Sequence, residues 1–211
     1  MKSLHNFIIK PNGERYNNTK KIGDKELILN TEIFHHQYVN REAVVLEAPV
    51  VNNTPIKKGD IIIVHHNVFR RWHNMHGVEK NSRSWLKQGT YAIYDDQIFA
   101  YKKNNTWKPL SGYCFVKPIK SYDNLIADKE QPLVGIMRYS DNSIKDIKNG
   151  DLVGFTPDSE YEFVVDNERL YRVLTKEITI KYEYQGQEEE YNPSWLQSGG
   201  RVNKGGKRKN S

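Results

Sequence analysis

The sequence predicts an all-β protein made of two small barrels in tandem. Tyr, Ile, Val, Thr and Phe are plentiful, Ala is scarce, and Asn, Gly and Pro recur every ~8 to 12 residues, as in short strands joined by turns. The chain has no long amphipathic helix pattern. Two similar stretches, PIKKGDIIIV at 55–64 and DIKNGDLVGF at 146–155, indicate that one unit occurs twice.

Two further pairs of stretches support a duplication. They are FIIKP at 7–11 with CFVKP at 114–118, and TYAIYDDQIFAY at 90–101 with LYRVLTKEITIK at 170–181. All three pairs occur in the same order, at offsets that fall from 107 to 91 to 80 residues. A Gly-Asp turn before a strand is common enough to recur by coincidence. The shared order favours a repeated framework with loops of different length.

Each copy is expected to contain the same elements in the same order. An apolar strand closed by Lys-Pro comes first, then a variable loop and a second strand. A turn follows, in which Gly59 or Gly150 supplies positive φ, and a buried strand comes next. A hairpin with an acidic turn ends the copy. The predicted domains are a first barrel at 1–111, a shorter second barrel at 112–197 and a flexible basic tail at 198–211.

The net charge of +6 is concentrated in this tail. The tail is interpreted as disordered and solvated, although contact with nucleic acid or an acidic partner is an alternative. It contains no acidic residue and these five basic ones: Arg201, Lys204, Lys207, Arg208 and Lys209.

The single cysteine, Cys114, lies in an apolar run and is expected to be a small buried residue. One cysteine cannot form an intrachain disulfide, which favours a reducing compartment. No stretch approaches the length of a membrane span, and the first apolar run is too short for a signal peptide. The expectation is a soluble, cytoplasmic protein without membrane contact.

The order of LHNFIIKP, a long polar loop, NREAVVLEAP, PIKKGDIIIV and TYAIYDDQIFAY resembles the GroES-type co-chaperonin family. The whole chain looks like the double-length, GroES-like proteins of tailed phages of marine bacteria. The first copy, residues 3–101, matches better than the second, residues 112–182. The resemblance implies two GroES-like barrels, a homo-oligomer and a place in the cytoplasm of the infected host cell.

In this family a mobile loop presents an apolar tripeptide to a GroEL-type chaperonin ring. The matching segment is 12–40, where Leu27, Ile28 and Leu29 lie in polar surroundings. The resemblance implies that these three residues bind the host's chaperonin and that the protein assists folding. In the alternative interpretation, ELILNTEI is a strand with Leu27, Leu29 and Ile33 packed inward.

The insertion at 65–89 combines basic and aromatic residues. Arg70, Arg71, Trp72, Arg83 and Trp85 suit a protein interface or stacking on single-stranded nucleic acid. Two alternative functions follow: a virion structural or assembly protein that reuses the barrel, and a barrel that binds single-stranded nucleic acid.

The insertion also contains His65, His66, His73 and His76, but has no cysteine beside them. We interpret these histidines as part of a surface loop, and no metal site is expected.

The sequence does not predict an enzyme or a cofactor. Asp95 and Asp96 are adjacent in a turn, and the glutamates at 188–190 form a solvated run. The chain contains neither a phosphate-binding loop nor a G-x-S-x-G motif.

Overall fold

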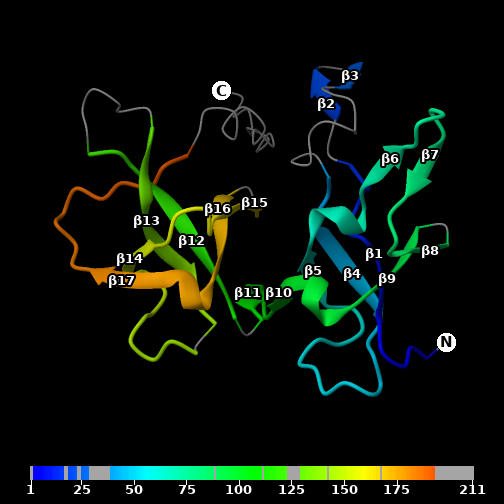
Figure 1. Ribbon diagram of the computed structural model, residues 1–211, viewed down its shortest axis with the longest axis horizontal. Coiled ribbons are helices and arrows are strands. Elements are labelled where there is room, and N and C mark those ends of the chain that lie inside the picture. Colours follow the sequence, from blue (N-terminus) through cyan, green and yellow to red (C-terminus); the bar gives the residue numbers. More distant parts are fainter. Residues whose placement is uncertain are drawn as a thin grey trace, which may run out of the picture. The chain divides into compact units, whose positions relative to one another are not determined.

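The computed structural model describes most of the chain. The described residues are 2–16, 19–22, 25–28, 39–87, 89–110, 112–122, 129–141, 143–166 and 168–192, with backbone only for 19–22 and 25–28. The chain divides into two compact units (Figure 1). The first comprises Met1–Cys114 with Tyr139–Lys145, and the second comprises Phe115–Arg138 with the chain from Asp146 onward.

The first unit contains a seven-stranded sheet with the order β11-β10-β5-β4-β1-β9-β8. Its strands are β1 (Phe7–Pro11), β4 (Glu42–Glu47), β5 (Ile61–Val64), β8 (Trp85–Lys87), β9 (Thr90–Ile93), β10 (Ile98–Lys103) and β11 (Thr106–Pro109). Two separate hairpins are β2 (Thr19–Ile22) with β3 (Lys25–Ile28) and β6 (Arg71–His73) with β7 (Glu79–Asn81). Short 3-10 turns are η2 (His66–Val68) and η3 (Asp95–Gln97).

The second unit contains a six-stranded sheet with the order β15-β16-β12-β13-β14-β17. Its strands are β12 (Tyr113–Lys120), β13 (Glu130–Tyr139), β14 (Leu152–Phe155), β15 (Tyr161–Val165), β16 (Glu168–Leu174) and β17 (Ile178–Tyr182), with the turn η5 (Thr175–Glu177) before β17. The strand order β17-β14-β13-β12-β16-β15 repeats the order β10-β5-β4-β1-β9-β8 of the first unit.

The glycine of each Gly-Asp turn has the same conformation and the same partner. Gly59 has φ of 91° and Gly150 has φ of 96°, in the region that favours glycine. The Gly59 amide donates to the Val45 carbonyl at 2.8 Å, and the Gly150 amide donates to the Met137 carbonyl at 2.7 Å. These bonds tie each turn to the strand that precedes it in the sheet.

The aspartate of each turn also acts in the same way. Oδ2 of Asp60 accepts from the Lys57 amide at 2.8 Å, and Oδ2 of Asp151 accepts from the Lys148 amide at 2.8 Å. In the second turn, hydrogen bonds from Lys181 and from the Lys148 amide lower the pKa of Asp151. The aspartate therefore closes the turn while the glycine allows its backbone path.

The prediction of an all-β fold is confirmed, whereas the prediction of closed barrels is not. Over the described residues both large sheets are open, since β11 and β8 end one sheet and β15 and β17 end the other. No described helix is long and apolar enough to cross a membrane.

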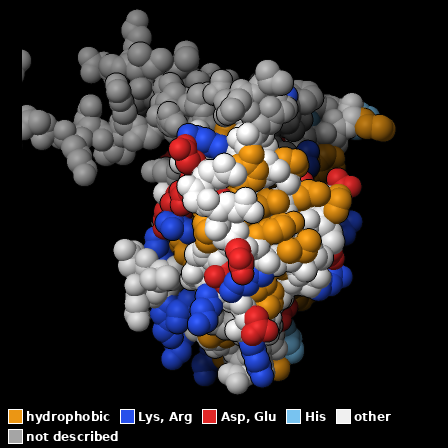
Figure 2. Space-filling view, turned by 90° about the vertical axis from the view of Figure 1, so that its left-hand side faces the viewer, with side chains coloured by type: hydrophobic (Ala, Val, Ile, Leu, Met, Phe, Trp, Pro, Cys, Tyr) orange, Lys and Arg blue, Asp and Glu red, His pale blue; other side chains and the backbone are white. Residues whose placement is uncertain are grey.

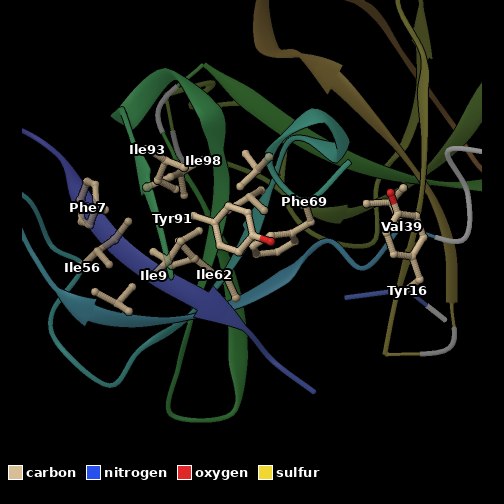
Figure 3. Close-up of a cluster of buried hydrophobic side chains, with 14 residues drawn as sticks. Phe7, Ile9, Tyr16, Val39, Ile56, Ile62, Phe69, Tyr91, Ile93 and Ile98 are labelled. Atoms are coloured by element: carbon tan, nitrogen blue, oxygen red, sulfur yellow. The ribbon is translucent and has the colours of Figure 1, made fainter. Parts of the chain in front are cut away.

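The buried side chains of the first unit include the hydrophobic cluster drawn in Figure 3. The alternation in β4 buries Ala43 and Val45, while the intervening residues are partly exposed. Near the centre, the rings of Phe69 and Tyr91 meet edge to face with centroids 4.8 Å apart. The hydrophobic cluster is therefore built in part from aromatic side chains of β9 and of the chain after η2.

The buried part of the second unit includes a charged residue. Lys117 of β12 is 1% exposed, and its Nζ donates to Oδ1 of Asn192 at 2.5 Å. Burial lowers the pKa of this amine. The matching residue of the first copy, Lys10, is exposed, so the repeat gave no sign of this difference. Cys114 is buried, as predicted.

Substituting alanine for Gly59 or Gly150 should destabilise the protein by about 1–3 kcal/mol each, because a Cβ is strained at these φ values. Urea unfolding measures this loss. Lys57→Ala, in the first turn, keeps its amide and should leave stability nearly unchanged. Equal effects of Gly59→Ala and Lys57→Ala would contradict the strain argument.

Replacing Lys117 with Met should change how stability depends on pH. The pKa of Lys117 in the folded protein lies below its unfolded value of about 10.4, so the unfolded chain binds more protons between the two. The stability of the unsubstituted protein therefore gains a contribution as pH rises through this window. The unfolding free energy of Lys117→Met minus that of the unsubstituted protein should fall from pH 7 to pH 10. A constant difference would refute the assignment.

Candidate functional site

Residues 65–89, which we call the insertion, leave the sheet of the first unit after β5 and return to it through β8. They include η2 and the hairpin of β6 and β7, which extends from the first unit in Figure 1. Strand β8 pairs with β9 in antiparallel fashion. The insertion is thus a folded element with a defined base, in place of the surface loop expected.

Arg15 holds the base of the insertion. Its Nε donates to the Phe69 carbonyl at 2.5 Å, its Nη2 to the Arg70 carbonyl at 3.2 Å, and its Nη1 to Oδ1 of Asn81 at 2.8 Å. The guanidinium also lies 5.6 Å from the centroid of the Tyr91 ring. Burial lowers the pKa of Arg15 and raises that of Tyr91. One side chain thus ties both arms of the insertion to the first unit.

Arg71, a predicted contact residue, has structural partners at the base. Its amide donates to the hydroxyl of Tyr16 at 2.6 Å, and its guanidinium lies 5.2 Å from the Tyr16 ring centroid. Its Nη1 is 3.3 Å from a carboxylate oxygen of Glu79. These contacts assign Arg71 chiefly to positioning the hairpin.

The tip of the hairpin is organised around Asn74. Its Oδ1 accepts from the amides of His76 and Val78 at 3.0 and 2.9 Å, and its carbonyl accepts from Gly77 at 2.9 Å. Gly77 has φ of 71°. The turn leaves the side chain of Met75 98% exposed.

Several large apolar side chains of the insertion are exposed. Trp72 on β6 is 47% exposed and Trp85 on β8 is 42% exposed. Met75, Val78 and Leu86 are also exposed. Tryptophan is among the residue types that are enriched at binding surfaces.

The insertion also carries positive charge. Arg83, Lys80 and Lys87 are exposed and Arg70 is half-buried. The carboxylate of Glu79 lies beside Arg71. The surface is therefore suited to a partner that combines apolar and acidic groups.

Two of the four histidines of the insertion, His65 and His66, are stacked. The rings of His65 and His66 are 4.3 Å apart, and Nδ1 of His65 accepts from the Asn67 amide at 3.1 Å. Across the described ranges, no three His, Cys, Asp or Glu side chains are grouped so that they could hold a metal ion.

The predicted tripeptide is only partly within the described chain. Leu27 and Ile28 lie on β3, where their backbones pair with Lys20 and Thr19 of β2. Leu29 lies outside the described residues, as does the basic tail. The segment 12–40 thus contains a hairpin.

A polar cluster in the second unit has its charges matched internally. Arg169 contacts the carboxylates of Glu130 and Glu162 and donates to the hydroxyl of Tyr171 at 2.7 Å. Tyr171 in turn donates to Glu130 at 2.6 Å. Although burial opposes it, the hydrogen bond to Glu130 raises the pKa of Arg169. We interpret this cluster as structural.

Of the residues predicted from the sequence as contacts, Trp72, Arg83 and Trp85 are exposed, whereas Arg70 and Arg71 are half-buried. The two residues that fix the base of the insertion were not predicted. Arg15 and Tyr16 follow β1 and have no distinctive spacing, so no signal in the sequence links them to residues more than 50 positions away.

No protein-family model and no curated protein matches this chain.

Replacing Arg15 with Ala should release the base of the insertion, because three acceptors lose their donor. The expected loss of unfolding free energy is about 1–3 kcal/mol. Limited trypsin digestion should cleave at Lys80, Arg83 and Lys87 several times faster than in the unsubstituted protein. Met75→Ala, at the exposed tip, should change neither. Unchanged cleavage in Arg15→Ala would refute the role of Arg15.

Proposed function

We propose that the protein is a phage-type, GroES-like co-chaperonin that binds the chaperonin ring of the host through segment 12–40 and assists protein folding. The repeated strand order supports the duplication of one unit, which the sequence resemblance also implies. Binding through Leu27, Ile28 and Leu29 needs no catalytic group or cofactor.

One observation carries this proposal: the two ends of segment 12–40 are fastened side by side next to the sheet. The side chain of Asn40 is buried and donates to the carbonyls of Asn12 and Glu14 at 2.9 and 2.8 Å. The Asn12 amide donates to the Glu42 carbonyl at 2.9 Å. Strands β1 and β4 are neighbours in the sheet, so the chain between them is an excursion from a fixed base. Such a segment suits presentation to a partner.

The energetics favour a ring of copies over a single one. Each apolar side chain docked in a groove contributes roughly 1.5 to 3 kcal/mol, from which the cost of ordering the segment is subtracted. A single tripeptide binds weakly on these terms. Several copies that engage a ring together gain from effective concentration.

A second candidate function is a structural or assembly contact in the virion through the insertion. The exposure of Trp72 and Trp85 on a folded, basic element favours this alternative. Single-stranded nucleic acid is the third interpretation of the same surface, and its binding would weaken steeply with salt.

Light scattering of the protein mixed with a bacterial chaperonin ring and ATP tests the proposal. We expect a nucleotide-dependent complex that is lost when Leu27, Ile28 and Leu29 are all changed to Ser. Changing Trp72 and Trp85 to Ser in a second variant should leave the complex intact. Absence of a complex with folded, unsubstituted protein would overturn the proposal. Loss in the tryptophan variant alone would move the binding site to the insertion.

A further inference from the structure

Strand β17 ends the sheet of the second unit, whereas its counterpart in the first unit is covered. Strand β10 pairs on its outer side with β11, in the register Ala100 with Pro109 and Lys102 with Trp107. In the described part of the second unit, no strand pairs with the outer side of β17. Among the described residues, the outward N–H and C=O groups of β17 therefore have no strand partner, which is the arrangement that can accept another strand.

One face of the sheet beside this edge is apolar. Two cross-strand rows form it, Val134–Gly154–Ile180 and Ile136–Leu152–Tyr182. A Cβ on Gly154 would lie 2.9 Å from Cε2 of Tyr182 and 3.5 Å from Cβ of Ile180, so both side chains lie against this glycine. Ile180 is 48% exposed and Tyr182 is 39% exposed. Figure 2, which views the second unit, shows hydrophobic side chains gathered in one area among charged ones.

On the corresponding face of the first unit the position that matches Ile180 is buried, whereas Ile61 and Lys102, which match Leu152 and Tyr182, are half-buried. Ile63 and Ala100 occupy the positions of Gly154 and Ile180, and they are 1% and 0% exposed. Trp107 of β11 is also buried. Ile180 is thus exposed at a sheet position that is buried in the other copy of the repeat.

We propose that a second copy of this chain covers the edge, with β17 pairing antiparallel to β17 of the second copy about a two-fold axis at Ile180. In this register Ile180 faces Ile180, Thr179 faces Lys181, and Ile178 faces Tyr182. No like charges lie directly opposite one another. The row Val134–Gly154–Ile180 then continues into the same row of the second copy.

The composition of β17 favours its own copy as the occupant. The strand has no proline and no acidic residue that would repel a neighbouring strand. Its one lysine, Lys181, is bound within its unit, with Nζ 2.7 Å from Oδ2 of Asp151 and donating to the Asp146 carbonyl at 3.0 Å. A two-fold arrangement uses the same patch on both subunits. This interface does not depend on the proposed function.

Cysteine crosslinking tests both the edge and the register. In a Cys114→Ala background, Ile180→Cys places two cysteines face to face across the axis, with Cα atoms about 4.5–5.5 Å apart, within disulfide range. Mild oxidation should convert most of the protein to a covalent dimer. Val164→Cys, on the exposed opposite edge strand β15, is the matched control and should remain monomeric. Equal crosslinking of the two variants would overturn the register.

Sedimentation of the full chain provides the second measurement. We expect a dimer that Ile180→Asp weakens by about tenfold or more, because two carboxylates would meet at the axis. Val164→Asp should leave the dissociation constant unchanged. Circular dichroism spectra identical to that of the unsubstituted protein exclude misfolding. A monomer at all concentrations would overturn the proposal and leave the edge to a strand from another protein.

Discussion

The turns between β4 and β5 and between β13 and β14 depend on one constraint, a glycine at positive φ followed by an aspartate. Gly59 and Gly150 turn the backbone in a direction that other residues adopt only with strain, and Asp60 and Asp151 close the turn on an amide three residues earlier. This geometry sets the register between β4 and β5 and between β13 and β14. The remaining strands add to these pairs in the same order in both units, so the duplicated framework rests on the two turns.

The framework holds segment 12–40 and the insertion through polar anchors. Asn40 fastens both ends of segment 12–40, and Arg15 fastens both arms of the insertion. Both anchors donate hydrogen bonds to backbone carbonyls of the segments that they hold. The apolar side chains farther out need not contribute to folding. They are free to serve a binding role, as Trp72 and Trp85 would on the insertion.

The two units differ where the repeat has diverged. β11 covers the outer edge of β10, whereas β17 ends its sheet within the described chain. Likewise, a lysine that is exposed at position 10 is buried at position 117, where Asn192 accepts its hydrogen bond. The second unit therefore buries an amine that is exposed in the first unit. It also leaves the outer edge of β17 without a strand partner among the described residues, and the proposed dimer would supply one.

The sequence by itself determined the all-β class, the two Gly-Asp turns and the order of the repeated elements along the chain, because these depend on local backbone preference and on alternation along each strand. It also marked the insertion by its unusual composition. Only the tertiary structure decided that the sheets are open, that Arg15 holds the insertion and that Lys117 is buried. These features depend on contacts between residues more than 50 positions apart, whose partners leave no periodic pattern in the chain.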